Sequence, residues 1–417
     1  MKKDLLLSAV ALAAGPLFAA LVPVSPQGGE TIPVVPEVQL SVQRLATHAE
    51  RVALLKADAA GEKKLAKGDG WKKARPLVLS WEATGRERGP WKLELGKDPA
   101  LLDARVHYVS NRKVNVLTGR AEGDGAAAKR LSCEFPLANL EVGETYYWRV
   151  TCNGRCGKWA CGPKCGCNAF TNVVRSAVAS FKTDPAAPRW IAIEGNVKNI
   201  RDLGGWPTAD GGRIRQGLVY RGQGLNDNSV TGEGRGRNRL TVEDVRYLTG
   251  TLGIRTDLDL RSIGETADLA ESPLGPQVKF ILRSSESYQG IFTPNGMKVM
   301  AENFRVFCDR ANYPVYFHCI GGADRTGALA YVLKAVCDVS LHDLEVDWEQ
   351  TFYPRLSELW EEYDGPGFWC QLLHFDQGFA AYGDAQTPIR EKVVAYLHAC
   401  GVTDEEIGKV RAILIGR

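Results

Sequence analysis

The chain has no marked excess of charge of either sign. Its 417 residues carry 52 Lys and Arg against 49 Asp and Glu, a formal net charge of +3. This balance gives no electrostatic reason to expect a nucleic-acid partner, and no segment resembles a nucleic-acid-binding motif. The sequence also shows no internal repeat. At 44% hydrophobic and 24% charged residues it reads as globular, and its length suits two domains better than one.

The start of the chain reads as a targeting segment. A basic start is followed by an apolar run from Leu5 to Val24, with small residues near Ala19 and Ala20. This pattern predicts a secretory signal over residues 1–24, with an uncleaved membrane anchor as the alternative. No cysteine lies near its end, which argues against a lipid-modified terminus. We therefore expect an exported protein (periplasmic, cell-surface or secreted) with no membrane span unless this segment is retained.

Cysteines are unevenly distributed. There are eleven in total, and five fall between Cys152 and Cys167. The six in the first half of the chain are Cys133, Cys152, Cys156, Cys161, Cys165 and Cys167. The tight spacing is loosely compatible with zinc. In an exported protein, disulfides are the favoured interpretation, and an even count suits them. The pairing cannot be read from the sequence.

The pattern along the chain predicts two domains. Residues 25–75 give no clear pattern, whereas 76–183 contain short runs rich in β-branched and aromatic residues, which predict an all-β sandwich. Leu140 to Val150 resembles the penultimate strand of fibronectin type III-like modules. A proline-containing linker, 184–189, leads to residues 190–417, where strands alternate with helical stretches as in an α/β domain. The ligand of the sandwich is left open.

One short loop carries most of the chemical information. His318 to Gly327 reads His-Cys-Ile-Gly-Gly-Ala-Asp-Arg-Thr-Gly, between an expected strand at 313–317 and an expected helix at 328–336. A strand, a glycine-rich loop and a helix N-terminus direct backbone N–H groups at one point and attract an anion. The same field should acidify Cys319, and Arg325 can hold two phosphoryl oxygens. An inert core cysteine would explain neither the glycines nor the arginine.

This loop resembles the Cys-x5-Arg-Thr-Gly signature of cysteine-dependent protein tyrosine phosphatases. It is more closely similar to a bacterial tyrosine/lipid phosphatase family whose loop reads His-Cys-x-x-Gly-Lys-Asp-Arg-Thr-Gly. The likeness covers about residues 190–417. Its other segments are Asn199 to Gly205, Gly217 to Arg221, Leu258 to Ser262 with Glu265, Asp343 to Phe352, and Val393 to Leu414.

The resemblance implies a catalytic domain with a central, mostly parallel sheet flanked by helices. It implies hydrolysis of a phosphomonoester through a cysteinyl-phosphate intermediate, with a phosphorylated protein or a small phosphomonoester as substrate. A protein tyrosine phosphatase, of broad specificity or not, is the leading interpretation. No cofactor and no metal are expected, because a thiolate and a guanidinium supply what a metal would. The carboxylate clusters of magnesium-dependent phosphatases are also not apparent.

Individual roles follow from the same resemblance. Cys319 is the predicted nucleophile, and Arg325 with the loop amides is predicted to stabilise the transition state. Thr326 either donates its hydroxyl to the thiolate or caps the helix. The predicted substrate-binding residues are Ile320, Gly321, Gly322, Ala323, Thr326 and Gly327.

Five further residues complete the predicted site. His318, Asp202 and Asp259 are expected to order the loop and the cleft wall without touching substrate. Asp324 is the first candidate for the general acid because it lies inside the loop. Glu286, in the segment where a mobile acid loop would fall, is the second.

Two alternatives remain. The first keeps the mechanism but takes phosphoinositides or inositol phosphates as substrate. Ala323, where the family has lysine, argues against it, and the basic segment from Arg235 to Arg239 argues slightly for it. The second is a non-catalytic surface or adhesion protein with a degenerate phosphatase domain, suggested by the potential for exposed aromatics at Trp71, Trp81 and Trp91. The intact Cys319 and Arg325 speak against that alternative.

Overall fold

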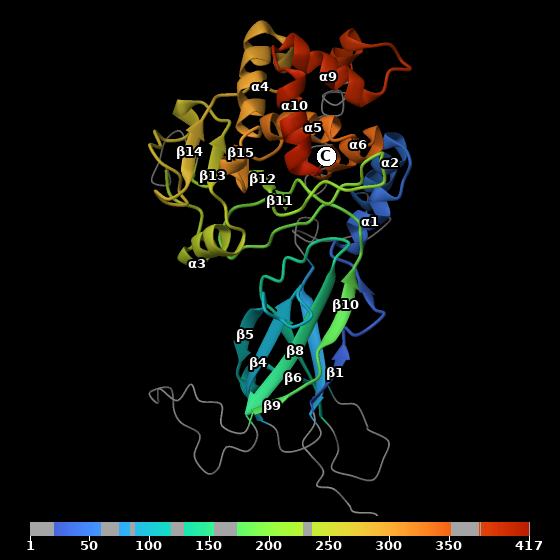
Figure 1. Ribbon diagram of the computed structural model, residues 1–417, viewed down its shortest axis with the longest axis vertical. Coiled ribbons are helices and arrows are strands. Elements are labelled where there is room, and N and C mark those ends of the chain that lie inside the picture. Colours follow the sequence, from blue (N-terminus) through green and yellow to red (C-terminus); the bar gives the residue numbers. More distant parts are fainter. Residues whose placement is uncertain are drawn as a thin grey trace, which may run out of the picture. The chain divides into compact units, whose positions relative to one another are not determined.

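The computed structural model describes residues 21–59, 75–83, 88–117, 129–153, 173–227, 236–351, 375 and 377–416 (Figure 1). The chain divides into two compact units. The first comprises Met1–Glu30, Leu77–Pro136 and Thr145–Phe181; the second comprises Thr31–Pro76, Leu137–Glu144 and Lys182–Arg417. Residues 184–189, predicted to be a linker, therefore lie within the second unit.

The first unit is built on two sheets. The strands of one, in spatial order, are β1 (Leu21–Ser25), β3 (Leu77–Ala83), β7 (Lys129–Phe135) and β6 (Asn115–Leu117). The other runs β10 (Ala179–Thr183), of which residues 179–181 belong to this unit, then β8 (Thr145–Asn153), β4 (Arg88–Gly96) and β5 (Arg105–Val109), with β9 (Val173–Arg175) beside β8. The short strand β2 (Thr31–Ile32) belongs to the second unit. Trp81 of β3 packs against Trp91 of β4, with ring centroids 5.3 Å apart.

Several predictions about this part of the chain were wrong. The sheets begin at Leu21 rather than at residue 76, so the last residues of the predicted signal segment form a strand antiparallel to β3. Trp81 and Trp91 are buried, with exposed fractions of 0% and 2%, because they fill the space between the sheets. The expected exposed aromatics are therefore absent at these two positions, and Trp71 lies outside the described residues.

The disulfide prediction is wrong for Cys133. Its thiol is free and buried in β7, and it donates a hydrogen bond to the carbonyl oxygen of Glu134. Cys152 is buried in β8. The other four cysteines, from Cys156 to Cys167, lie outside the described residues, so the choice between disulfides and zinc there stays a prediction. Within the described residues, no helix is long and apolar enough to span a membrane.

The second unit contains the predicted mostly parallel sheet. Its strands, in spatial order, are β11 (Arg201–Asp202), β12 (Val219–Gln223), β15 (Val315–Cys319), β13 (Thr256–Asp259) and β14 (Lys279–Leu282). Only β11 is antiparallel to its neighbour. Every residue of β15 is buried, as expected for a central strand covered on both faces.

Eight α-helices are named within the described residues. They are α1 (Glu37–Gln43), α2 (His48–Ala59), α3 (Val242–Arg246), α4 (Pro294–Val306), α5 (Asp324–Val336), α6 (Leu341–Gln350), α9 (Ile389–Ala399) and α10 (Asp404–Leu414). Helices α1 and α2 fall in residues 25–75, a range with no clear pattern in the sequence. The second unit thus extends beyond the predicted catalytic domain.

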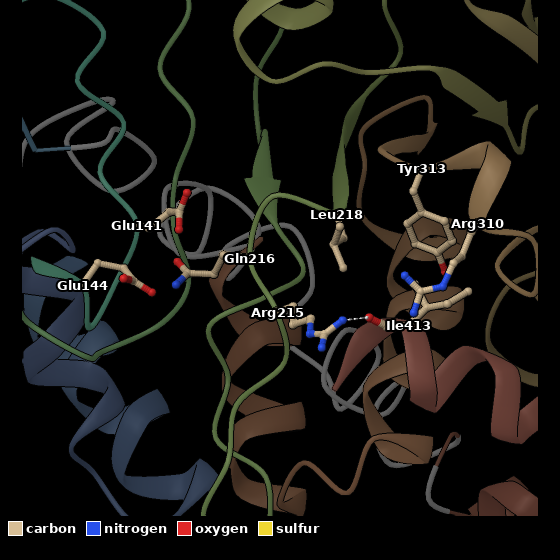
Figure 2. A pocket seen from close by; sticks show the side chains of 8 residues that line it. All are labelled: Glu141, Glu144, Arg215, Gln216, Leu218, Arg310, Tyr313 and Ile413. Carbon is tan, nitrogen blue, oxygen red and sulfur yellow. Dashed lines mark hydrogen bonds between the residues drawn. The ribbon is translucent and has the colours of Figure 1, made fainter. Parts of the chain in front are cut away.

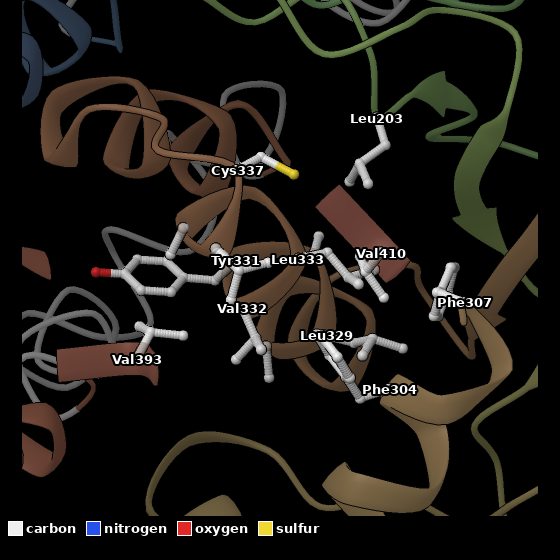
Figure 3. Close-up of a cluster of buried hydrophobic side chains, with 14 of the residues drawn as sticks. Leu203, Phe304, Phe307, Leu329, Tyr331, Val332, Leu333, Cys337, Val393 and Val410 are labelled. Atoms are coloured by element: carbon white, nitrogen blue, oxygen red, sulfur yellow. The ribbon is translucent and has the colours of Figure 1, made fainter. Parts of the chain in front are cut away.

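Helix α5 lies at the centre of the main hydrophobic core. From Thr326 to Val336 all of its residues are buried, because β15 and α4, α6 and α9 surround it. Figure 3 shows Leu329 and Leu333 of α5 among Phe304, Phe307 and Val410. A helix that is apolar all round must be enclosed. The loop that precedes α5 is therefore attached to a helix that is enclosed by the core.

Candidate active site

The candidate loop connects the central strand to the central helix. Cys319 is the last residue of β15, and α5 begins at Asp324. The helix N-cap is Ala323, and no side chain there accepts a hydrogen bond from the first turn. By contrast, Thr293 caps α4 and Ser340 caps α6 through their hydroxyls. The first N–H groups of α5 are therefore left for an anion.

Hydrogen bonds from behind fix the orientation of the loop peptides. The side-chain amide of Asn199 donates to the carbonyl oxygens of Gly321 and Gly322, both at 3.1 Å. Arg221 donates to the Gly322 carbonyl oxygen at 2.9 Å. In a planar trans peptide the N–H points opposite to the preceding C=O. The N–H groups of Gly322 and Ala323 are thereby turned to the other side, toward Cys319.

Gly322 is required by two constraints. Its φ is +69°, and a Cβ atom at this position would lie 2.3 Å from the carbonyl oxygen of Gly222 in β12. Any other residue would be strained and would also collide with the strand. Gly321 has no atom within 4 Å of such a Cβ. The two glycines therefore contribute differently: Gly322 shapes the loop, and Gly321 leaves its face open.

The environment of Cys319 favours its thiolate. Burial raises the pKa, but hydrogen bonds from the Thr326 hydroxyl and backbone, the Arg325 charge and the Gly322 N–H together lower the pKa below its ordinary value. Thr326 is the third residue of α5, so its interpretation as the helix cap is wrong. Its buried hydroxyl has no nitrogen or oxygen partner among the described residues, which leaves the sulfur as its acceptor.

Arg325 is held by a carboxylate. Its Nη1 and Nη2 bond the two oxygens of Glu265 at 2.8 and 2.9 Å. Glu265 lies in the 3-10 helix Ile263–Glu265 and also accepts from the backbone and hydroxyl of Ser262. The Arg325 hydrogen bonds, with Ser262, bring the pKa of Glu265 to about 2 in spite of partial burial. The guanidinium is thus preorganised before any phosphate binds.

His318 lies between two aspartates of the neighbouring strand. Its Nε2 is 3.0 Å from Asp257 and its Nδ1 is 3.7 Å from Asp259. Burial lowers the pKa of His318, but Asp259 and Asp257 outweigh burial and raise it. Asp259 forms a closer ion pair with Arg261 at 2.6 Å. Both His318 and Asp259 are buried, and their closest ion-pair contacts are to Asp257 and Arg261 respectively.

A buried ion-pair network that the sequence reasoning missed lies beneath the loop. Asp347 of α6 binds Arg201, Arg221 and Lys334 at 2.9, 2.9 and 2.5 Å. Burial would raise the pKa of Asp347, but the three cations hold it well below the ordinary range. Arg201 also donates to the side-chain oxygen of Asn199 at 2.5 Å. Arg201 and Arg221 belong to the segments that resemble the phosphatase family. The sequence therefore pointed to these two arginines, but it did not show that they bind Asp347 and support the loop.

Asp202 does not take the position assigned to it. Its carboxylate accepts hydrogen bonds from the N–H groups of Gly204 and Gly217 and from Arg189. Burial raises the pKa of Asp202 to about 6, against the charge of Arg189. It orders the turn after β11, and the role beside the loop belongs to Arg201 and its partner Asn199.

The two acid candidates lie differently. The carboxylate of Asp324 accepts a hydrogen bond from the hydroxyl of Tyr288. Glu286 is exposed, two residues before Tyr288. The Tyr288 ring packs edge-on against Trp348, with centroids 6.1 Å apart. The structure thus brings Asp324, and not Glu286, into a fixed hydrogen bond at the helix N-terminus.

Gly327 serves packing. A Cβ atom there would lie 2.9 Å from the indole of Trp348 on α6. Its N–H donates to the carbonyl oxygen of Ala323 within the first turn. The close packing against Trp348 therefore explains why a glycine is needed at position 327, without the predicted contact with substrate.

A separate pocket of about 550 Å³ lies at the other end of the sheet (Figure 2). Leu218 and Tyr313 line it, and these residues precede β12 and β15, whereas Cys319 ends β15. The remaining lining residues are Glu141, Glu144, Arg215, Gln216, Arg310 and Ile413. It contains none of the predicted site residues.

The second unit contains the region that resembles known proteins. A family model described as the tyrosine phosphatase family matches residues 192–416. A predicted tyrosine-protein phosphatase of Cupriavidus necator is 27% identical over 193 residues, 38% of this chain and 65% of that protein. The chain therefore spans less than two thirds of that relative's length.

Two solved structures of a yeast protein also match. One is the core catalytic domain of the PP-IP phosphatase Siw14 from S. cerevisiae, at 15% identity, covering 41% of this chain and 95% of that one, with a TM-score of 0.23. The other, a Siw14 catalytic core, is 13% identical and covers 39% of this chain and 92% of that one, with a TM-score of 0.24. TM-scores this low do not establish a shared fold.

Proposed function

Because the chain belongs to the tyrosine phosphatase family, we propose that it hydrolyses phosphomonoesters through a cysteinyl-phosphate intermediate. The observation that carries the proposal is the convergence of three features on one point. These are the acidified Cys319, the uncapped N-terminus of α5, and Arg325 held by Glu265. A tetrahedral dianion at this point would meet a nucleophile, backbone donors and a planar cation.

The reaction has two steps. The Cys319 sulfur forms a bond to phosphorus while the bond from phosphorus to the ester oxygen breaks, and Asp324 gives a proton to the departing oxygen. A water molecule then attacks phosphorus, the P–S bond breaks, and inorganic phosphate and the thiolate are released. The water's proton returns to Asp324. Arg325 and the loop N–H groups bind the equatorial oxygens throughout, and Thr326 stabilises the thiolate as the leaving group.

We propose an aryl ester, phosphotyrosine in a protein, as the substrate. Two observations support it. Tyr288 places an aromatic ring beside Asp324 and Trp348, next to the phosphate position. Ala323 puts no second cation in the loop, which disfavours multiply phosphorylated lipids or inositols.

The rest of the chain suits an exported enzyme. We propose that residues 1–20 belong to a secretory signal and that the two-sheet unit is a fibronectin type III-like module. Its sheet orders and antiparallel pairing support that assignment. The ligand of this module is left open.

The test uses the purified full chain with p-nitrophenyl phosphate and a phosphotyrosine peptide, in the presence of a chelator. Turnover is expected without added metal, and Cys319→Ser should abolish it. Cys308→Ser is the matched control, because Cys308 is a half-buried free thiol two residues after the end of α4, and it should retain activity. Undiminished turnover by Cys319→Ser would overturn the proposal.

A further inference from the structure

The helix α2 is joined to α6 by a buried charge cluster. Arg51 of α2 is fully buried, and its Nε and Nη2 bond the two oxygens of Glu349 at 2.5 and 2.9 Å. Its Nη2 also bonds Glu345 at 2.8 Å. His48, one turn earlier, lies 2.7 Å from the same Glu349. Glu349 is 1% exposed, so this is an interior pairing.

The same helix α6 carries two side chains on which the phosphate loop depends. Asp347 binds both Arg201 and Arg221. Arg221 donates directly to the Gly322 carbonyl oxygen, and Arg201 holds Asn199, which donates to the same oxygen. Trp348 fills the space left by Gly327 and packs against Tyr288, the partner of Asp324. Glu345, Asp347, Trp348 and Glu349 occupy little more than one turn, so α6 cannot shift for one without moving the others.

We propose that Arg51 is a positioning residue for the phosphate loop, and that the segment from Glu37 to Ala59 clamps α6 in the register that the loop requires. This proposal rests on the proposed function. The segment lies outside residues 192–416, the part matched by the family model. The clamp is therefore an addition of this chain to the catalytic unit, acting through α6.

The physical basis is the cost of an unpaired buried charge. Removing Arg51 leaves Glu349, buried beside Glu345, with only its hydrogen bond to His48, and α6 must move to let the carboxylates reach water. That movement pulls Asp347 from beneath the loop and Trp348 from Gly327. The Gly322 and Ala323 N–H groups then lose their fixed direction, and the Cys319 thiolate loses part of its stabilisation.

The test compares Arg51→Met with Arg44→Met. Arg44 pairs with Glu37 at 3.4 Å, but both side chains are 67% exposed, so it is a matched arginine without the buried contact. All measurements are made well below the melting temperature of each variant. Arg51→Met should lower kcat/KM for p-nitrophenyl phosphate and vanadate affinity by about 2- to 30-fold. The pH at which iodoacetate labels Cys319 should rise. Arg44→Met should change none of these.

Three results separate a positioning role from mere stabilisation. A lower melting temperature with unchanged kcat/KM, vanadate affinity and labelling profile would overturn the proposal. Arg51→Lys, which keeps the charge, should restore part of each property. If Arg51→Met does not fold, Glu345→Gln, which removes one of the two carboxylate partners, carries the same comparison, and an unchanged labelling profile there counts equally against the clamp.

The iodoacetate and vanadate measurements do not depend on turnover. If the wild-type protein fails to hydrolyse any phosphomonoester, the proposed function fails. A labelling profile of Cys319 that still shifts in Arg51→Met would then leave the clamp supported.

Discussion

The hydroxyl of Tyr288 donates a hydrogen bond to the carboxylate of Asp324. This bond joins the segment before α4 to the first residue of α5. Tyr288 holds a φ of +53°, an uncommon conformation for a residue with a side chain. The surrounding contacts, including the edge-on packing on Trp348, hold the residue there. In the proposed mechanism, this carboxylate is the group that protonates the departing ester oxygen.

Loss of Asp324 should matter most for poor leaving groups. A general acid protonates the departing oxygen, and an alkyl or phenyl oxygen needs this far more than nitrophenolate does. Asp324→Asn should slow hydrolysis of phosphotyrosine by about 10²- to 10⁴-fold, and that of p-nitrophenyl phosphate much less. Assays across aryl phosphates of graded leaving-group basicity measure the difference. Tyr288→Phe should give a weaker version of the same dependence.

Glu286→Gln and vanadate affinity control this experiment. Glu286 is exposed and should contribute little. A uniform slowing of all substrates by Asp324→Asn, together with lost vanadate binding, would show that Asp324 only shapes the loop. The role of acid would then pass to Glu286.

Glu265 should be needed to keep Arg325 in place. Glu265→Gln removes a charge from a bidentate pair, and hydrogen bonds to charged groups contribute about 1.5–3 kcal/mol each. We expect kcat/KM to fall by about 10- to 150-fold. Exposed Glu271→Gln is the control and should behave as wild type. A Glu265→Gln enzyme with normal vanadate affinity would contradict this role.

The same pair gives stability a defined pH dependence. The pKa of Glu265 is about 2 in the folded chain, below its ordinary value of 4.5. The ionised form therefore stabilises the fold above about pH 4.5, and this contribution is lost as pH falls toward 2. Denaturant unfolding of wild type and Glu265→Gln between pH 7 and 3 should converge as the pH falls.

The local pattern was enough to predict the phosphate loop. Strand, loop and helix follow one another within about 25 residues, and the residues that create the anion site lie in the same stretch. The shift of the strand to Val315–Cys319 follows from Pro314, which cannot donate to the ladder. The general plan of a mostly parallel sheet was likewise readable from alternating strands and helices.

The supporting network could not be predicted in this way. Arg221 and Asp347 are 126 positions apart, and Arg201 and Asp347 are 146 apart. An aspartate on a helix is usually exposed, and only the folded chain shows that three cations surround this one. Strand β1 was missed for a related reason, since more than 50 residues separate Leu21–Ser25 from its partner β3. The prediction that Trp81 and Trp91 are exposed was wrong because aromatic residues in strands occur both at surfaces and between sheets, and the sequence does not distinguish the two.

Cys319 should be the most reactive thiol of the described residues at neutral pH. Its pKa is lowered, whereas burial raises the pKa of Cys308 to about 11 and that of Cys337 to about 12. Mild peroxide should inactivate the enzyme and a thiol reductant should restore it. Mass spectrometry after iodoacetamide at pH 7 should find label on Cys319 before the other two. Peroxide-insensitive turnover would show that Cys319 is shielded or is not the nucleophile.

Asp347 should be essential for stability. Asp347→Asn leaves Arg201, Arg221 and Lys334 buried without their shared counter-ion. Breaking a buried pair in this way costs about 3–5 kcal/mol. Asp343→Asn on the same helix, where the carboxylate accepts from the exposed Ser340, should cost well under half of that. Denaturant titration measures both, and equal losses would show that the network contributes nothing special.

Replacing the two loop glycines separately should distinguish loop shape from loop openness. Gly322→Ala introduces a side chain at a φ of +69°, which costs about 1–2 kcal/mol. It also places a Cβ 2.3 Å from the Gly222 carbonyl oxygen, so the loop must move away from β12. The Gly322 carbonyl then leaves Asn199 and Arg221, and the N–H groups turn from the phosphate position. We expect vanadate affinity to fall at least about tenfold, with a similar loss in kcat/KM.

Gly321→Ala adds the same methyl group where no atom lies within 4 Å, so its effect should be clearly smaller. Isothermal titration with vanadate gives both values, and equal losses in the two variants would mean that the backbone conformation at Gly322 does not set the loop.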